Sequence, residues 1–184
     1  MIGDCHAGTI HCCEHDIQRK VKEIAQQKNT LWVGIGDYAE FITPSDPRFD
    51  PSQKSIAEWV ETDNIAESQT KWLVELFKPI KDKCIGLLYG NHEDAIRIHN
   101  HDNVIKNLCE RLGVSNLGYS CFLRLFFQRQ NSKQVQMITG ALTHGSGWAI
   151  TKGAKLNRLQ RFMNDFEADF YAHGHMHDII TDSR

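Results

Sequence analysis

The chain has 184 residues, a length that fits a single domain of residues 1–184 with a core large enough to need no disulfide bonds. Hydrophobic residues make up 41% and charged residues 24%, and the net charge is -2, so the composition argues against a basic nucleic-acid arm or a polybasic membrane patch. The longest apolar runs are too short to span a bilayer and the N-terminus lacks the regions of a signal peptide, which predicts a cytoplasmic protein without membrane contact.

The predicted elements of the first half alternate between helix and strand. Residues 15–28 place apolar side chains on one helical face, and residues 31–36 form a short apolar run that is typical of a buried strand. Residues 43–51 hold three prolines and two aspartates, which indicates a loop. Residues 55–77 are predicted to be mostly helical, in two pieces, with Pro79 ending the second piece.

The second half continues the alternation. Residues 84–89 are predicted as another buried strand, and residues 103–112 as a helix that Gly113 stops. Two strands, a helix and a last short strand are expected at residues 119–128, 134–143, 154–166 and 169–172. Strands that alternate with helices predict an α/β layered fold.

Side chains that can bind metal ions follow the chain start or a predicted strand at five places, often beside glycine. These places are Asp4-Cys5-His6, Gly36-Asp37, Gly90-Asn91-His92-Glu93, Thr143-His144-Gly145 and Gly174-His175-Met176-His177. Ligands at the carboxyl ends of strands converge on one crevice in open α/β sheets, and glycine lets the backbone turn so that the next side chain points into it. The five segments therefore predict one shared site.

The residue types at these places suit a pair of metal ions. Imidazole, carboxylate and amide groups favour Zn, Fe, Mn or Ni over Ca, and no thiolate is required. Alternation along an extended chain puts Asp4 and His6 on the same side, and it relates His175 and His177 in the same way. Each piece alone is a weak signal, because an isolated DxH or HxH pair is more often an accident of sequence than a ligand pair. The ordered set of five is what points to function.

The ordered series DxH, GDxxE, GNHE, H and GHxH resembles the calcineurin-like metallophosphoesterase superfamily, in its phage and bacterial form, over nearly the whole chain. The resemblance implies an αββα fold, in which a layered β-sandwich is flanked by helices. The chain departs from the family pattern at its ends, because only residues 1–3 precede Asp4 and only residues 178–184 follow His177. We therefore expect it to lack the usual first strand and the usual C-terminal strands, with Asp4 and His6 poorly anchored beside an unpaired sheet edge.

The resemblance also implies a role for each residue of the series. A first metal ion would be held by Asp4, His6, Asp37 and His177, and a second by Asp37, Asn91, His144 and His175. Asp37 would bridge two divalent or trivalent ions (Mn, Fe, Zn or Ni) roughly 3.5–4 Å apart. A hydroxide shared between the ions would hydrolyse a phosphate-ester substrate, either a phosphomonoester or a phosphodiester. Because its ligands lie on the thin N-terminal segment, the first ion is expected to bind more weakly than the second.

His92 is expected to stand outside the ligand set. In the family, the His of the Asn-His pair donates a proton to the leaving oxygen or stabilises its charge. Many relatives carry an acid three residues after the bridging Asp that orients this His, and Glu40 takes that position here in place of the commoner Asp. The resemblance therefore implies that the Glu40 carboxylate pairs with His92, raises its pKa and fixes its tautomer.

Two other functions are kept as alternatives. Asp4-Cys5-His6-Ala7-Gly8 is similar to the DxHxG start of the repair-nuclease branch, which would make DNA or RNA the substrate. A non-catalytic metal-binding module on the same fold is the second alternative, since some relatives lose ligands. A protein serine/threonine phosphatase is disfavoured, because Phe41-Ile42 stands where those enzymes carry an arginine after the second motif.

A few further residues have weaker interpretations. His11, Cys12, Cys13 and His15 form a dense cluster. They are expected to belong to a loop and helix start that lines the mouth of the metal site rather than to form a separate zinc site. Arg97 and Arg158 are candidate phosphate contacts, although solvated surface positions fit them better.

Overall fold

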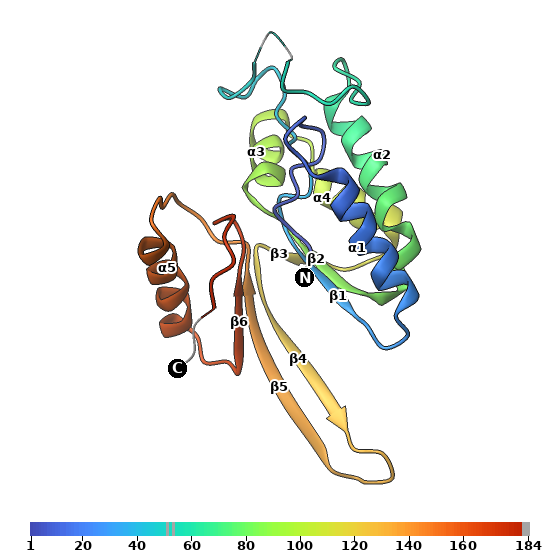
Figure 1. The fold of residues 1–184 in the computed structure, drawn as a ribbon, viewed down its shortest axis with the longest axis vertical. Helices are drawn as coiled ribbons and strands as arrows, with labels where there is room; N and C mark the ends of the chain where they lie inside the picture. The colour runs from blue at the N-terminus through green and yellow to red at the C-terminus, as the bar shows by residue number, and fades with distance from the viewer. Residues whose placement is uncertain (51, 53, 182–184) are drawn as a thin grey trace.

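The computed structural model describes residues 1–50, 52 and 54–181. This part of the chain forms two three-stranded sheets and five α-helices (Figure 1). The strands are β1 (Trp32–Ile35), β2 (Cys84–Leu88), β3 (Asn116–Gly118), β4 (Ser120–Gln128), β5 (Val135–Thr143) and β6 (Phe170–His173). The helices are α1 (Glu14–Gln26), α2 (Ile65–Phe77), α3 (Asn91–Asn100), α4 (Val104–Leu112) and α5 (Lys152–Asp165), with a 3₁₀ helix, η1 (Lys78–Lys83), after α2.

The first sheet has the order β1-β2-β3 and is parallel throughout. Helices α1, α2 and α4 gather beside it (Figure 1) and bury their apolar faces in the larger core. Val21 of α1, Leu73 and Phe77 of α2 and Leu108 of α4 are all buried there. Each such side chain stabilises the fold by roughly 1.5–3 kcal/mol when it leaves water. The helices therefore hold the first sheet from one face and leave the other face free for the second sheet.

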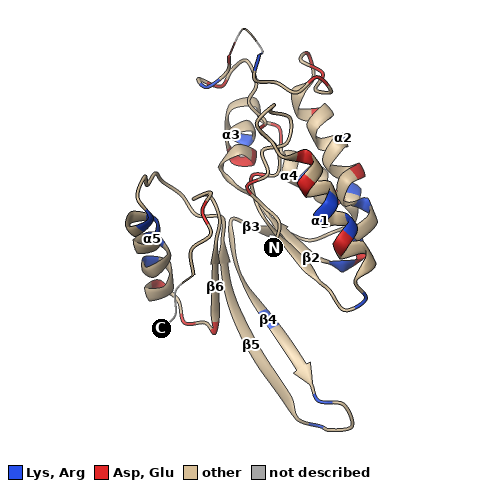
Figure 2. Ribbon diagram, in the orientation of Figure 1, with Lys and Arg blue, Asp and Glu red and all other residues tan. Residues whose placement is uncertain are grey.

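The second sheet has the order β4-β5-β6, with β4 and β5 antiparallel and β6 parallel to β5. Val33 and Leu88 of the first sheet share a buried cluster with Leu142 and Ala172 of the second. The two sheets therefore pack together, and α5 lies on the far side beside β6 (Figure 1). Charged residues lie mainly on the helices and loops, whereas the β4–β5 hairpin carries few of them (Figure 2). This α/β architecture of two sheets flanked by helices confirms the predicted fold class.

Most predicted elements lie within two residues of the observed ones, and the exceptions have local causes. Residues 55–64 were predicted to be helical but form turns and a bridge between Thr9 and Ile56, and α2 begins only at Ile65. Pro79 lies inside η1 rather than ending the helical region. Helix α3 was not predicted, because it begins inside the GNHE motif, where polar side chains hide the helical period.

The N-terminal segment fills the sheet edge beside β1, where Ile2 forms a parallel bridge with Gly34. Ile2 donates from its main-chain N to Val33 O at 3.1 Å and accepts from Ile35 N at 2.8 Å. Asp4 N donates to Gly36 O at 2.9 Å. The expected poor anchoring of Asp4 is therefore wrong, because main-chain hydrogen bonds on both sides hold this segment against β1. None of the helices in the described part of the chain has the length and apolarity that a membrane crossing requires.

Candidate metal centre

The seven predicted ligands converge at the carboxyl ends of strands from both sheets. Asp37 follows β1, Asn91 follows β2, His144 follows β5, and His175 and His177 follow β6. The N-terminal segment brings Asp4 and His6 to the same place. Five of the seven have a left-handed backbone, namely Asp4, His6, Asp37, His175 and His177, with φ between 48° and 68°.

The left-handed backbone, rather than the predicted alternation of an extended chain, accounts for the directions of these side chains. Simple alternation along an extended chain was expected to align Asp4 with His6, and His175 with His177. Instead, each of the four residues turns the chain locally with a positive φ, a conformation that L-residues adopt rarely and that clusters at functional sites. Asp4 and His6 lie in one group of possible metal ligands, whereas His175 and His177 lie in different groups.

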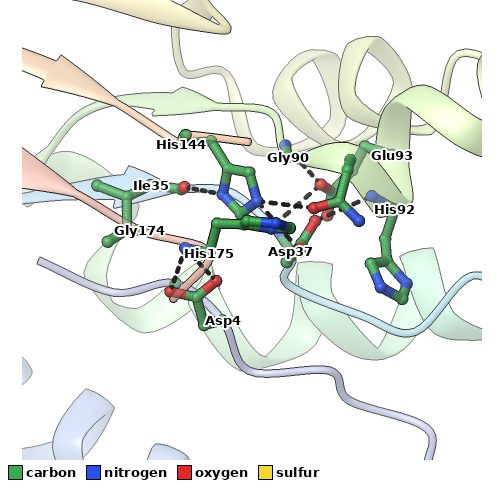
Figure 3. Close-up of polar contacts among 12 residues, drawn as sticks. Asp4, Ile35, Asp37, Gly90, His92, Glu93, His144, Gly174 and His175 are labelled. Carbon is green, nitrogen blue, oxygen red and sulfur yellow. Dashed lines mark hydrogen bonds and ion pairs between the residues drawn. The ribbon is translucent and has the colours of Figure 1, made fainter. Parts of the chain in front are cut away.

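Asp37 and His144 form the buried centre of the site (Figure 3). Oδ2 of Asp37 lies 3.1 Å from Nε2 of His144, and Oδ1 of Asn91 lies 3.1 Å from the same nitrogen. His144 Nδ1 lies 2.7 Å from Ile35 O, so Nδ1 carries a hydrogen that it donates to this carbonyl. In the neutral ring, Nε2 then presents a lone pair to two oxygen acceptors. Three electron-pair donors that face one another in this way suit a bound cation.

The charges at this centre favour a cation as well. Burial alone would raise the pKa of Asp37 and lower that of His144. Their mutual contact outweighs burial, so the pKa of the Asp37 carboxyl lies below its usual value and that of His144 lies above. The same negative field that attracts a proton to His144 attracts a metal ion.

His175 completes a group of possible metal ligands with Asp37 and His144. Its Nε2 lies 2.8 Å from Gly147 O and donates to it, which leaves the lone pair on Nδ1. Among the described residues, His175 Nδ1 is the buried side-chain atom without a hydrogen-bond partner. A buried acceptor without a partner is costly, and a metal ion in this group would satisfy it.

A second group of possible ligands comprises Asp4, His6 and His177. Nε2 of His6 lies 3.1 Å from Nε2 of His177, and Oδ1 of Asp4 lies 3.9 Å from the same His177 nitrogen. Oδ2 of Asp37 lies 3.9 Å from His6 Nε2, so Asp37 borders both groups. This group is more open than the other, since the His177 side chain is 54% exposed.

Glu40 and His92 form a third group of possible ligands with His6, but their contacts differ from the predicted pairing. The Glu40 carboxylate contacts His6, with Oε2 2.8 Å from Nδ1. His92 Nδ1 lies 2.5 Å from the main-chain O of Glu40 and donates to it. The Glu40 carbonyl, rather than its carboxylate, therefore lies against His92. Figure 3 shows the His92 ring pointing away from His144 and His175.

Glu93 is the last residue of the GNHE motif, and the sequence assigned it no role. In the structure its side chain links the second and third motifs through hydrogen bonds. Its carboxylate accepts from the main-chain N of Asp37 at 3.0 Å, of Tyr38 at 2.9 Å and of Gly90 at 2.8 Å. Burial and the nearby charge of Asp37 raise the pKa of Glu93, while the three N–H donors act in the opposite direction. The signal available in the sequence was its place three residues after Gly90, where a capping-box acid stands at a helix start.

Arg48 is a second residue beside the centre that the sequence did not predict. Its NH1 lies 3.1 Å from His92 Nε2. The two arginines named instead lie elsewhere, because Arg97 pairs with Asp94 and Arg158 donates to main-chain oxygens of the segment after β5. Nothing in the sequence pattern of its proline-rich loop marks Arg48.

A cavity of about 550 Å³ opens at the Asp4, His6 and His177 side of the centre. His11, Cys12 and Cys13 line it, whereas His15 of the same predicted cluster does not. A smaller cavity of about 160 Å³ adjoins Glu40 and Arg48. The centre is therefore accessible to a ligand from the outside.

Residues 1–178 match a family model described as calcineurin-like phosphoesterase. No curated protein and no solved structure shows a significant match to the chain. The matched segment contains all seven converging ligands together with Glu40 and His92.

Proposed function

The chain belongs to the calcineurin-like phosphoesterase family, and we propose that it is an enzyme that uses two metal ions to hydrolyse a phosphate ester. The observation that carries the proposal is the position of Asp37. Its buried carboxylate borders both groups of possible ligands, 3.1 Å from His144 Nε2 and 3.9 Å from His6 Nε2. One carboxylate between two such groups is what a pair of closely spaced metal ions requires.

The proposed ligand sets follow from two of these groups, the one with Asp37, His144 and His175 and the one with Asp4, His6 and His177. The first ion would be held by Asp4, His6, His177 and Asp37, and the second by Asp37, Asn91, His144 and His175. When bound, two such ions lower the pKa of a water shared between them and neutralise charge on the phosphate oxygens. Nitrogen and oxygen ligands without thiolate suit Mn, Fe, Zn or Ni.

The other residues of the centre would orient the metal ligands and supply a proton. Hydrogen bonds to Ile35 O and Gly147 O fix the rings of His144 and His175, so each presents one nitrogen to the centre. Glu40 does the same for His6 through Nδ1. His92 lies outside both proposed ligand sets, and its Nε2 would deliver a proton to the leaving oxygen.

Metal analysis combined with hydrolysis assays tests this proposal. We expect the purified protein, loaded with Mn, to bind two ions per chain and to hydrolyse an aryl phosphate monoester or a bis-aryl diester. Single-stranded DNA and RNA form a third substrate arm, which tests the nuclease alternative. Asp37→Asn is the negative control, which should lose both metal binding and turnover.

Two bound ions without turnover of any substrate would refute the hydrolase proposal. That outcome would instead support the non-catalytic metal-binding module. Turnover that survives in Asp37→Asn would show that the activity arises elsewhere, for example from a contaminant.

A further inference from the structure

Arg48 lies in the loop between the Asp37 turn and α2, and a buried carboxylate holds its guanidinium. Arg48 donates from Nε to Asp46 Oδ1 at 3.0 Å and from NH2 to Asp46 Oδ2 at 2.7 Å. The Asp46 side chain is 8% exposed, whereas that of Arg48 is 45% exposed. This fork fixes the plane of the guanidinium and occupies its Nε and NH2 edge. The NH1 group remains, and it faces His92.

The atom that NH1 faces is the reactive nitrogen of His92. NH1 lies 3.1 Å from His92 Nε2. A carbonyl oxygen can only accept, so the contact with Glu40 O places the hydrogen of the neutral ring on Nδ1. Nε2 then accepts from Arg48. Arg48 therefore donates to the same atom that, under the proposed function, delivers a proton to the leaving oxygen.

NH1 of Arg48 also lies close to the proposed metal centre. The His6 ring, which belongs to the group of Asp4, His6 and His177, lies edge-on to His92 with a centroid separation of 4.5 Å. Guanidinium N–H groups suit phosphate oxygens as acceptors. Arg48 is therefore placed beside the position that the proposed function gives to the phosphate.

We propose that Arg48 binds a phosphoryl oxygen of the substrate through NH1, and that Asp46 positions it. The inference rests on the proposed function. The cavity of about 160 Å³ bordered by Arg48, Phe49 and Ile56 leaves room for substrate beside the guanidinium. Arg48 is thus a substrate-contacting residue, and Asp46 acts on the substrate only through Arg48.

Binding of inorganic phosphate provides a test that does not need turnover. Its dissociation constant is measured by calorimetry on the Mn-loaded protein, and KM and kcat are measured with an aryl phosphate. In Arg48→Ala, we expect phosphate binding to weaken and KM to rise by about 10- to 100-fold, the effect of losing a hydrogen bond to a charged group. Arg48→Lys keeps the charge but not the fork, so it should fall between Arg48→Ala and the wild type.

The matched control is Arg97→Ala, which removes an arginine that is likewise held by an aspartate. Arg97 donates from Nε and NH2 to Asp94 at 2.9 and 2.7 Å, on the exposed side of α3. We expect no change in phosphate binding or KM. Circular dichroism of each variant establishes that it is folded before binding is compared.

A double-mutant cycle tests the positioning role of Asp46. Asp46→Asn should weaken phosphate binding in the wild type but have no further effect in Arg48→Ala. An equal effect in both backgrounds would overturn the positioning role. An Arg48→Ala variant that binds phosphate as tightly as Arg97→Ala would overturn the role of Arg48 itself. Phosphate binding that depends on Arg48, in a wild type without turnover, would refute the hydrolase proposal and support the Arg48 contact.

Discussion

Oδ2 of Asp37 lies 3.1 Å from Nε2 of His144, and both side chains are almost fully buried, with 1% and 0% exposure. The same Asp37 oxygen lies 3.9 Å from Nε2 of His6, which belongs to the more open group of possible ligands. A main-chain hydrogen bond of 2.9 Å from His92 N to Oδ1 holds the carboxylate in this position. Asp37 is thus the residue through which the two proposed metal positions are joined.

Asp37→Asn should abolish the binuclear centre while leaving the fold intact. The amide keeps one oxygen that can accept from His92 N but loses the negative charge shared by both groups. Changes at residues that merely support a metal ligand cost roughly 10- to 100-fold in affinity, so loss of this ligand should cost at least about 100-fold. Metal content after dialysis measures the effect. Asp82→Asn, an exposed aspartate of η1, is the control and should keep its metals.

His92→Ala should retain both metal ions and lose turnover in a way that depends on the leaving group. Loss of a general acid costs roughly 10²- to 10⁴-fold, mostly for substrates whose leaving oxygen needs a proton. We expect a small effect with p-nitrophenyl esters and a large one with alkyl esters. Equal losses for both, or loss of metal, would contradict the proton-donor role.

Glu40→Gln tests whether the Glu40 carboxylate acts on His6, as its contact in the structure indicates, or on His92, as the sequence predicted. The carboxylate lies 2.8 Å from His6 Nδ1, so it should act on metal binding through His6. We expect the first ion to bind about 10- to 100-fold more weakly, with the second ion unchanged. Calorimetric titration with Mn measures this, with the exposed Glu58→Gln as control. Unchanged metal binding with lower turnover would instead support the pairing of the carboxylate with His92.

The convergence of the seven candidate ligands was predictable from the sequence for a physical reason. Apolar runs such as residues 84–89 reveal buried strands, and the polar residues that follow must lie where those strands end. Parallel β1 and β2 bring Asp37 and Asn91 to the same edge, and β5 and β6 do the same for His144 and His175. The apolar pattern of the strands therefore predicts where these residues lie along the sheet edges.

Side-chain partners were less predictable, because they depend on local backbone turns that no period reveals. The Glu40 carboxylate was expected on His92, but it contacts His6, and His92 contacts the Glu40 carbonyl instead. Arg48 and Asp46 lie two residues apart in a proline-rich loop, and only the folded loop shows that their fork faces His92. The directions of loop side chains, unlike the ends of strands, had to come from the structure.

Glu93→Gln should lower the stability of the protein before any metal is added. The Glu93 carboxylate accepts three main-chain N–H groups, from Asp37, Tyr38 and Gly90. An amide has one accepting oxygen, so at least one of these buried N–H groups loses its partner and faces an NH₂ group. Each such loss costs about 1–3 kcal/mol. Urea unfolding of the metal-free protein measures the change, and Glu110→Gln on the exposed side of α4 should show almost none.

Metal titration should reveal two unequal sites. The sequence predicted a weaker first site because of a thin N-terminal strand, whereas the structure supplies a different reason. Asp37 and His144 are buried, and His175 Nδ1 is buried without a partner, so their group is closed and preorganised. In contrast, the His177 side chain of the other group is 54% exposed, and binding there must first order this side chain.

Calorimetry with Mn should therefore show a tight step followed by a weaker one, and variants should assign each step. His177→Ala should remove the weak step and leave the tight one, because the buried group does not use His177. His175→Ala should remove the tight step, since it deletes the buried nitrogen that lacks another partner. Two steps of equal affinity in the wild type, or loss of the tight step in His177→Ala, would contradict this order. The order matters for function, because a half-loaded centre would have only one ion to activate water and neutralise the phosphate.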